Sequence, residues 1–156
     1  MGFFGDVAGE FDVTRWLEVG AAGRMMGTRK GATWYIEQRP MVYGTLSAYL
    51  GKLEFDFFNR FEYRILKDAD DQMRHRQKVT LEMPPFNFSW LTLFASEEGF
   101  YIFGNERFNK LRLSAGSKVV YKKNFEMKIY YMFERKKILP VWANSDILGF
   151  NLSMDF

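Results

Sequence analysis

The sequence predicts an all-β fold: a single antiparallel up-and-down transmembrane β-barrel of eight strands, with ten strands as the alternative. Three observations predict it. Apolar and polar residues alternate along several segments, with turn-forming residues between them. Aromatic residues make up 19% of the chain, with 17 Phe and 8 Tyr, and aromatic residues favour strands. The final segment, Leu148–Phe156, alternates strictly and ends in an aromatic residue, as the closing strands of bacterial outer-membrane barrels commonly do.

Eight segments carry this alternation. They are Val13–Met25, Ala32–Met41, Leu53–Leu66, Gln72–Met83, Ser89–Phe103, Arg107–Tyr121, Asn124–Arg135 and Ile147–Phe156. Many exceed the roughly 9–11 residues that a tilted strand needs to cross a bilayer. Residues 42–52 either extend the second segment, form a short extra strand or make a helical turn, and the extra strand would favour the count of ten. We predict that residues 1–12 form an N-terminal periplasmic extension and that residues 13–156 form the barrel.

Each predicted strand has one apolar and one charged face. In the segment Leu53–Leu66, Phe, Leu, Tyr and Ile occupy most odd-numbered positions, whereas Glu, Asp and Arg occupy most even-numbered positions. A soluble antiparallel sheet alternates in the same way, with its apolar face inward. However, so many bulky apolar side chains would overpack the interior of a small barrel. We therefore predict that the apolar faces contact lipid and that the charged faces line the lumen.

The charged faces carry about ten acids and about eleven bases by strand parity. This balance suits an interior lattice of ion pairs, because an unpaired buried charge is costly. The predicted lumen ion-pair network consists of Glu18, Glu37, Arg39, Glu54, Asp56, Arg60, Glu62, Arg64, Arg74, Arg76, Lys78, Glu82, Glu98, Lys110, Arg112, Lys118, Glu126, Lys128 and Glu134. Within it, we expect Glu98 to face Lys110 or Arg112 on the next strand.

Basic residues gather at two of the predicted outer connections. This predicted outer basic rim consists of Arg29, Lys30, Arg135, Lys136 and Lys137. In an eight-stranded barrel the first and last strands are neighbours, which would bring the two basic connections together. The connection that contains Asp68, Asp70 and Asp71 is acidic instead. The basic rim would bind the phosphates of lipopolysaccharide, or it is simply a set of solvated loop ends.

Six large aromatic residues lie nearer the ends of predicted strands than their centres. They are Trp16, Trp34, Trp90, Trp142, Tyr101 and Tyr121. This placement is typical of the aromatic girdle at a membrane interface, although ordinary aromatic packing would also account for it. The closing strand carries a predicted insertion signal at Gly149, Leu152, Met154 and Phe156, which the outer-membrane insertion machinery would recognise.

The sequence offers little catalytic chemistry, and we expect no enzyme activity, cofactor or metal. His75 is the only histidine, and cysteine is absent. A catalytic His75 would need a partner such as Asp70 or Asp71 to orient it. Glu97 and Glu98 are adjacent on a predicted strand, so they point to opposite faces and do not form a carboxylate pair. The carboxylates show no calcium-loop spacing. The modest net charge of +3 does not predict nucleic acid as a partner.

Several short motifs stand out in the middle and at the end of the chain. They are Asn59-Arg60-Phe61-Glu62-Tyr63-Arg64, Arg74-His75-Arg76, Ser96-Glu97-Glu98-Gly99-Phe100, Arg107-Phe108-Asn109-Lys110-Leu111-Arg112 with Gly116, and Tyr130-Tyr131. They resemble a family of bacterial outer-membrane β-barrels that carries only a domain-of-unknown-function label. The resemblance covers residues 53–156 and implies a single-domain barrel that is made with a cleavable signal peptide. It supplies no catalytic residues.

The chain departs from that pattern in residues 42–52 and in showing no signal peptide. The predicted location in the bacterial outer membrane therefore requires that the signal has already been removed. We predict a small barrel with a charged, side-chain-filled lumen and a non-enzymatic, structural or binding role. Its partners would be the lipid bilayer, lipopolysaccharide and the insertion machinery.

Two alternative functions stay open at the level of sequence. A soluble lipocalin-like barrel would hold an apolar ligand inside and keep its charged faces in water. A barrel subunit of a larger outer-membrane complex would carry an apolar strip beyond what lipid requires, such as Phe55, Phe57 and Phe61 beside Val79 and Leu81.

Overall fold

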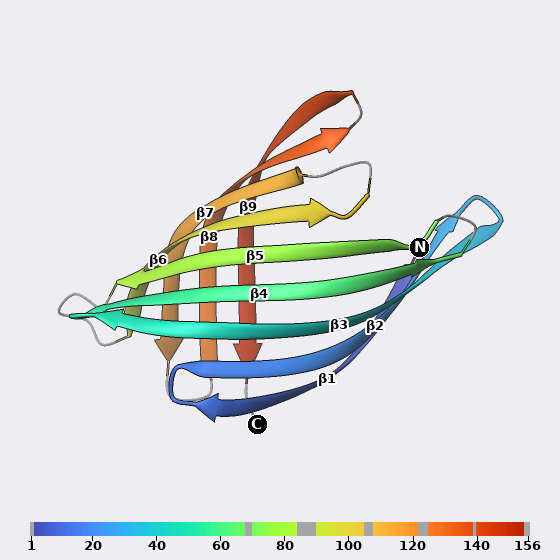
Figure 1. Cartoon of the computed structure of the whole chain (residues 1–156). Coiled ribbons are helices and arrows are strands. Elements are labelled where there is room, and N and C mark those ends of the chain that lie inside the picture. The colour runs from blue at the N-terminus through green and yellow to red at the C-terminus, as the bar shows by residue number, and fades with distance from the viewer. Residues whose placement is uncertain are drawn as a thin grey trace. The chain divides into compact units, whose positions relative to one another are not determined.

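In the part of the chain that the structure describes, nine β-strands form one sheet (Figure 1). The computed structural model describes residues 2–67, 70–83, 90–104, 108–121, 125–138 and 140–154. The strands are β1 (Gly2–Thr14), β2 (Leu17–Lys30), β3 (Thr33–Leu50), β4 (Leu53–Leu66), β5 (Gln72–Met83), β6 (Leu91–Ile102), β7 (Phe108–Tyr121), β8 (Phe125–Ile138) and β9 (Val141–Met154). Each strand pairs with the next along the chain, so the sheet is an antiparallel up-and-down sheet. No helix in these ranges is long and apolar enough to span a membrane.

The all-β, up-and-down architecture is confirmed, but the described residues form nine strands instead of eight. The additional strand is β1, which occupies the segment that we predicted to be a periplasmic extension and pairs with β2 along its length. Glycines in this segment weaken the alternation that would identify it as a strand. Gly5 and Gly9 stand at positions of its apolar face, so only residues such as Val7 and Phe11 mark the alternation.

Strand β3 resolves the ambiguity of residues 42–52. It continues without interruption through residues 42–50, so this piece extends the second predicted segment and is neither a separate strand nor a helical turn. Gly51 then begins the two-residue turn to β4 with a φ of 64°, and Gly31 begins the turn from β2 to β3 with a φ of 62°. Glycine adopts these positive φ angles without the steric cost that other residues meet.

The closing strand is longer than predicted. It begins at Val141 instead of Ile147. The run Asn144-Ser145-Asp146 suggested a loop, because Asn, Ser and Asp favour turns. Pairing with β8 holds this run in an extended conformation, with Ser145 opposite Glu134 and Asp146 opposite Phe133.

The chain divides into two compact units. The first unit comprises Met1–Leu46, Phe58–Gln77 and Phe100–Phe108, and the second comprises Ser47–Phe57, Lys78–Gly99 and Asn109–Phe156. Strands β1 and β2 belong to the first unit, and β8 and β9 belong to the second.

The buried side chains lie on the side of the strands that carries the charges, which we call the charged face. In the described part of the chain, the buried apolar residues are Met41, Phe94 and Phe100, and the buried polar ones are Arg39, Glu62, Thr80 and Glu98. The opposite, apolar face exposes large side chains, such as Val7 at 80% and Leu148 at 82%. Soluble proteins show the reverse, with charged side chains almost never fully buried.

Candidate functional site

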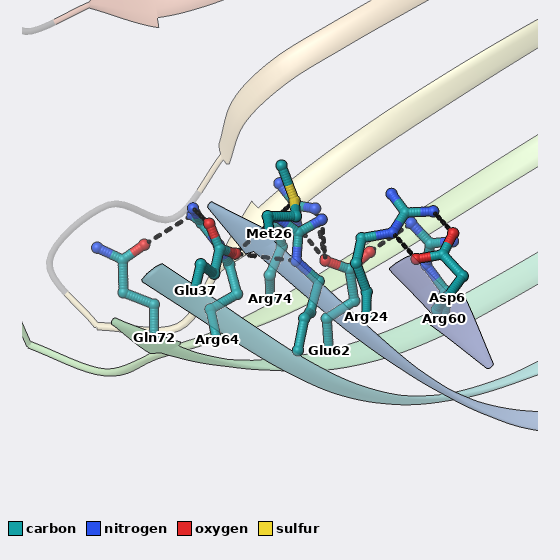
Figure 2. Close-up of polar contacts among 10 residues, drawn as sticks. Asp6, Arg24, Met26, Glu37, Arg60, Glu62, Arg64, Gln72 and Arg74 are labelled. Carbon is teal, nitrogen blue, oxygen red and sulfur yellow. Dashed lines mark hydrogen bonds and ion pairs between the residues drawn. The ribbon is translucent and has the colours of Figure 1, made fainter. Parts of the chain in front are cut away.

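The charged face of the first unit holds a connected group of ionic side chains, drawn in Figure 2. We call it the arginine cluster. It consists of Arg39, Arg60, Arg64 and Arg74 with Glu37 and Glu62. Its members come from β3, β4 and β5, where alternate residues project from the same face of a strand. The alternation seen in the sequence therefore places all six side chains on one face.

Glu62 lies at the centre of the cluster with 1% of its surface exposed. Its Oε2 atom accepts hydrogen bonds from Arg74 Nε at 2.9 Å and Arg74 Nη2 at 2.5 Å. Arg60 Nη2 lies 2.5 Å from Oε1, and Arg39 Nη1 lies 3.6 Å from Oε2. One buried carboxylate is thus surrounded by three guanidinium groups.

Glu37 forms the second centre. Its Oε1 atom accepts from Arg39 Nη2 at 2.6 Å and from Arg64 Nε at 2.7 Å, and its Oε2 atom accepts from Arg64 Nη2 at 3.0 Å. Arg64 also donates from Nη1 to Gln72 Oε1 at 3.1 Å. Arg39 joins the two centres, because it contacts both Glu37 and Glu62.

Several of the guanidinium groups on this face make cation–π contacts with phenylalanine rings. Arg60 and Arg76 lie 5.9 Å and 5.7 Å from the centre of the Phe58 ring. Arg74 and Arg76 lie 5.4 Å and 5.6 Å from the centre of the Phe100 ring. Such cation–π contacts orient a guanidinium without neutralising its charge.

Asp6 and Arg24 form a separate pair at the edge of the cluster that sequence reasoning missed. Arg24 donates to both oxygens of Asp6, from Nε at 2.7 Å and from Nη2 at 2.6 Å. The pair was overlooked because residues 1–12 were not predicted to form a strand. The signal was present, since Asp6 and Glu10 alternate with apolar residues. Glu10 accepts a hydrogen bond from the hydroxyl of Tyr43 at 2.8 Å.

The second unit has ionic groups of its own. Arg112 donates from Nε to Glu134 Oε2 at 2.7 Å and from Nη1 to Glu98 Oε2 at 3.3 Å, and Lys110 Nζ lies 3.3 Å from the same oxygen of Glu134. The predicted pairing of Glu98 with Arg112 is therefore present. Lys118 donates to Glu82 Oε2 at 2.6 Å as a separate pair.

The other predicted network members also lie on the charged face. Glu54 and Asp56 accept hydrogen bonds from the hydroxyls of Tyr49 (2.8 Å) and Ser47 (2.6 Å). Lys128 Nζ lies 4.0 Å from the centre of the Phe94 ring. The remaining members are Glu18 on β2, Lys78 on β5 and Glu126 on β8.

The residues of the predicted outer basic rim lie in two separate hairpins. In the β2–β3 hairpin, Arg29 Nε donates to the carbonyl of Gly31 at 3.1 Å, and the side chain of Lys30 lies outside the described residues. In the β8–β9 hairpin, the guanidinium of Arg135 lies 5.1 Å from the Trp142 ring, and Lys136 and Lys137 follow it on β8. These hairpins belong to different compact units, so their proximity stays a prediction.

His75 lies on the apolar face with a partner that was not predicted. Its Nε2 atom lies 3.0 Å from Asn59 Oδ1, and its ring stacks on Phe61 with the ring centres 4.5 Å apart. Asp71, which we had considered as an orienting partner, instead accepts from the amide of Leu66 at 3.1 Å and from a tyrosine hydroxyl. Asp68 lies outside the described residues. Asp71, which a catalytic His75 could have used, is therefore engaged by other groups in this structure.

Large aromatic residues lie near strand ends as predicted. Trp16 is in the turn after β1, Trp34 and Trp142 are the second residues of β3 and β9, Trp90 directly precedes β6, and Tyr101 is the penultimate residue of β6. The side chain of Tyr121 lies outside the described residues. Trp34 also contacts Phe3, with ring centres 5.7 Å apart.

The predicted insertion signal falls on the end of β9. Leu152 and Met154 are about half exposed on the apolar face, at 50% and 54%. Gly149 is on the charged face opposite Tyr130, whose ring covers it so closely that a Cβ atom there would clash. Phe156 lies outside the described residues.

Comparison with known proteins identifies a family and no activity. Residues 3–142 match the family model described as "Protein of unknown function (DUF2490)". No curated protein matches the chain. The family match begins at residue 3, so it includes β1 and the first hairpins as well as most of the region in which the motifs suggested a resemblance.

Proposed function

Because the chain belongs to the DUF2490 family of unknown function, we propose a function from its geometry: it forms a small β-barrel of the bacterial outer membrane. Its apolar face contacts lipid, and its charged face lines a lumen filled with side chains. Its role is structural or binding and not enzymatic, with lipopolysaccharide as a ligand of the basic hairpins.

The main support for this proposal is an inverted burial pattern, in which charged side chains are buried and large apolar side chains are exposed. Glu62, Glu98 and Arg39 are 1%, 6% and 8% exposed, whereas Leu148 and Phe11 are 82% and 68% exposed. Large apolar surfaces are unfavourable in water and favourable in hydrocarbon. A lipid environment therefore accounts for both faces at once.

The lengths and ends of the strands support a bilayer span. Strands of 12–18 residues exceed the roughly 9–11 residues that a tilted strand needs to cross the hydrocarbon core. Tryptophans near strand ends would lie at the two membrane interfaces, where amphipathic rings are enriched.

Basic hairpins would lie on the outer side of such a barrel. The β2–β3 and β8–β9 hairpins each connect an even-numbered strand to the next strand, as connections on one side of an up-and-down barrel do. They carry Arg29 and Arg135, and arginine suits the phosphates of lipopolysaccharide.

The soluble lipocalin-like alternative fits this structure less well. It requires an apolar interior and charged side chains in water. Here the fully buried Glu62 and the buried Arg39 lie on the face that also contains the few buried apolar residues. A soluble barrel would have to bury these charges while it exposed Leu148 and Phe11 to water.

The test is the behaviour of the purified chain with and without detergent. We expect the chain to fold into detergent micelles or lipid vesicles, to migrate differently on gels before and after boiling, and to aggregate when detergent is removed. A folded, monodisperse protein in detergent-free buffer would overturn the proposal.

A further inference from the structure

We propose that the arginine cluster is a binding site for one phosphoryl group, free or carried by a lipid headgroup. The proposal concerns the charged face alone, so it holds whether the apolar face meets lipid or water. It goes beyond the proposed barrel function, because it assigns a ligand to the charged face of the first unit.

Charge balance distinguishes the cluster from three other ion-paired groups of the described residues. Arg112 and Lys110 are balanced by Glu98 and Glu134, and Lys118 is balanced by Glu82. Asp6 likewise balances Arg24.

The cluster itself joins four arginines to only two glutamates, so these six side chains carry a net charge of +2 (four positive and two negative). A phosphoryl group carries about −1.5 to −2 near neutral pH.

The arginine side chains that carry the surplus positive charge are largely buried, and burying an uncompensated charge costs free energy. The side chains of Arg39, Arg60 and Arg74 are only 9%, 14% and 15% exposed. Buried cations are stable when a counter-charge lies beside them. Arg24 directly opposes Arg39 across the β2–β3 pair, and like charges in that position repel. An anion at the cluster would relieve both costs.

The cluster also has more donors than its carboxylates can accept. Four guanidinium groups offer about twenty N–H donors, whereas two carboxylates offer about eight acceptor sites. Among the described residues, the buried Nε atom of Arg60 has no hydrogen-bond partner, and neither has the buried Oε1 atom of Glu62 beside it. Arginine is suited to use such donors on phosphate, since its planar fork matches two phosphate oxygens.

The rings of Phe58 and Phe100 orient two of the arginines before any ligand binds. They lie against Arg60 and Arg74, the two guanidinium groups closest to Glu62. Holding these groups in place in advance reduces the ordering cost of binding. The cluster therefore combines surplus charge, free donor capacity and fixed geometry.

Calorimetric titration of the folded chain with inorganic phosphate tests the proposal, in a chloride buffer of matched ionic strength. We expect saturable binding of one phosphate per chain, and at least tenfold weaker binding in Arg60→Gln. The matched control is Lys118→Gln, which removes a cation from a balanced pair and should leave the affinity unchanged. Circular dichroism and denaturant titration check that each variant is folded.

A second variant keeps the test decisive if Arg60→Gln fails to fold. Ala22→Glu adds a carboxylate to the charged face, on β2 beside Arg24 and opposite Met41, and should abolish phosphate binding. Short-chain phosphatidic acid distinguishes the source: tighter binding than inorganic phosphate supports a headgroup, and equal or weaker binding supports a free phosphoryl ligand. The proposal would be overturned if the unmodified chain showed no saturable phosphate binding. It would also be overturned if Arg60→Gln and Lys118→Gln bound phosphate with the same affinity.

Discussion

Arg74 donates two hydrogen bonds to a single oxygen of Glu62, from Nε at 2.9 Å and from Nη2 at 2.5 Å. Arg60 and Arg39 approach the same carboxylate group. Because the side chain of Glu62 is fully buried, it holds together three cations that water does not reach well. The loss of this one negative charge should therefore cost more than the loss of a carboxylate from a one-to-one pair.

Replacing Glu62 with Gln tests this relationship. We expect Glu62→Gln to lower the free energy of unfolding by about 3–5 kcal/mol, because it leaves buried guanidinium groups uncompensated. Denaturant titration of the folded chain measures the change. Glu82→Gln is the control, since Glu82 forms a one-to-one ion pair with Lys118 among the described residues and its side chain is 16% exposed. Equal losses in the two variants would show that Glu62 has no central role.

Reversing a charge in the second unit should also destabilise the sheet. Arg112→Glu would place a third carboxylate between Glu98 and Glu134, which now lie 3.3 Å and 2.7 Å from the Arg112 guanidinium. The double variant Arg112→Glu/Glu134→Arg restores an opposite-charge pair, because the two residues are directly opposed across β7 and β8. We expect the double variant to recover part of the lost unfolding free energy. A double variant less stable than the single one would contradict this pairing.

Glycines on the charged face should differ in their tolerance to alanine. A Cβ atom at Gly116 would clash with the backbone of Ile129 and Tyr130, which cannot move without disturbing the β7–β8 pair. We expect Gly116→Ala to cost about 1–3 kcal/mol of unfolding free energy, as overpacking does. At Gly149 the obstacle is the ring of Tyr130, which can rotate away, so Gly149→Ala should cost less.

Gly23→Ala is the control for these glycine variants, because a Cβ atom there meets nothing within 4 Å. The same denaturant titration compares all three variants. A cost for Gly23→Ala as large as that for Gly116→Ala would mean that the loss comes from backbone entropy and not from the close contacts.

An arginine on the apolar face distinguishes lipid from water. Leu148 is 82% exposed near the middle of β9, so Leu148→Arg would be nearly harmless in a soluble protein. In a bilayer we expect it to lower the unfolding free energy by about 2–4 kcal/mol. Ser145→Arg, on the charged face of the same strand opposite Glu134, should cost far less. Denaturant titrations in lipid vesicles measure both.

The sequence allowed the two faces of the sheet to be predicted, because a period of two is a local property of each strand. Strand β1 was missed because Gly5 and Gly9 at two of its apolar positions weaken an alternation that Asp6 and Glu10 otherwise mark. The sequence also could not specify partners within the arginine cluster. Arg39 reaches glutamates on its own strand and on β4, and this choice depends on register and on long flexible side chains.

Two further sets of hydrogen-bond partners depend on which strands pair, and local alternation does not give this information. Glu54 and Asp56 accept from hydroxyls at the end of β3, a segment whose structure the sequence left ambiguous. His75 is near acidic residues in the sequence, but strand pairing brings Asn59 beside it instead. Alternation placed His75 on the apolar face, whereas its partner there depends on the pairing of β4 with β5, which proximity along the chain does not reveal.

The central claim is that the apolar face meets hydrocarbon, and spin labels along β9 test it most directly. The chain has no cysteine, so single cysteines can be introduced without background labelling. In vesicles, we predict that labels at Leu148, Phe150 and Leu152 are accessible to oxygen dissolved in lipid and protected from a water-soluble relaxing agent. Labels at Asn151 and Ser153, on the charged face, should be protected from oxygen. Equal accessibility at all five positions, or preferential contact of Leu148, Phe150 and Leu152 with the water-soluble agent, would contradict the account.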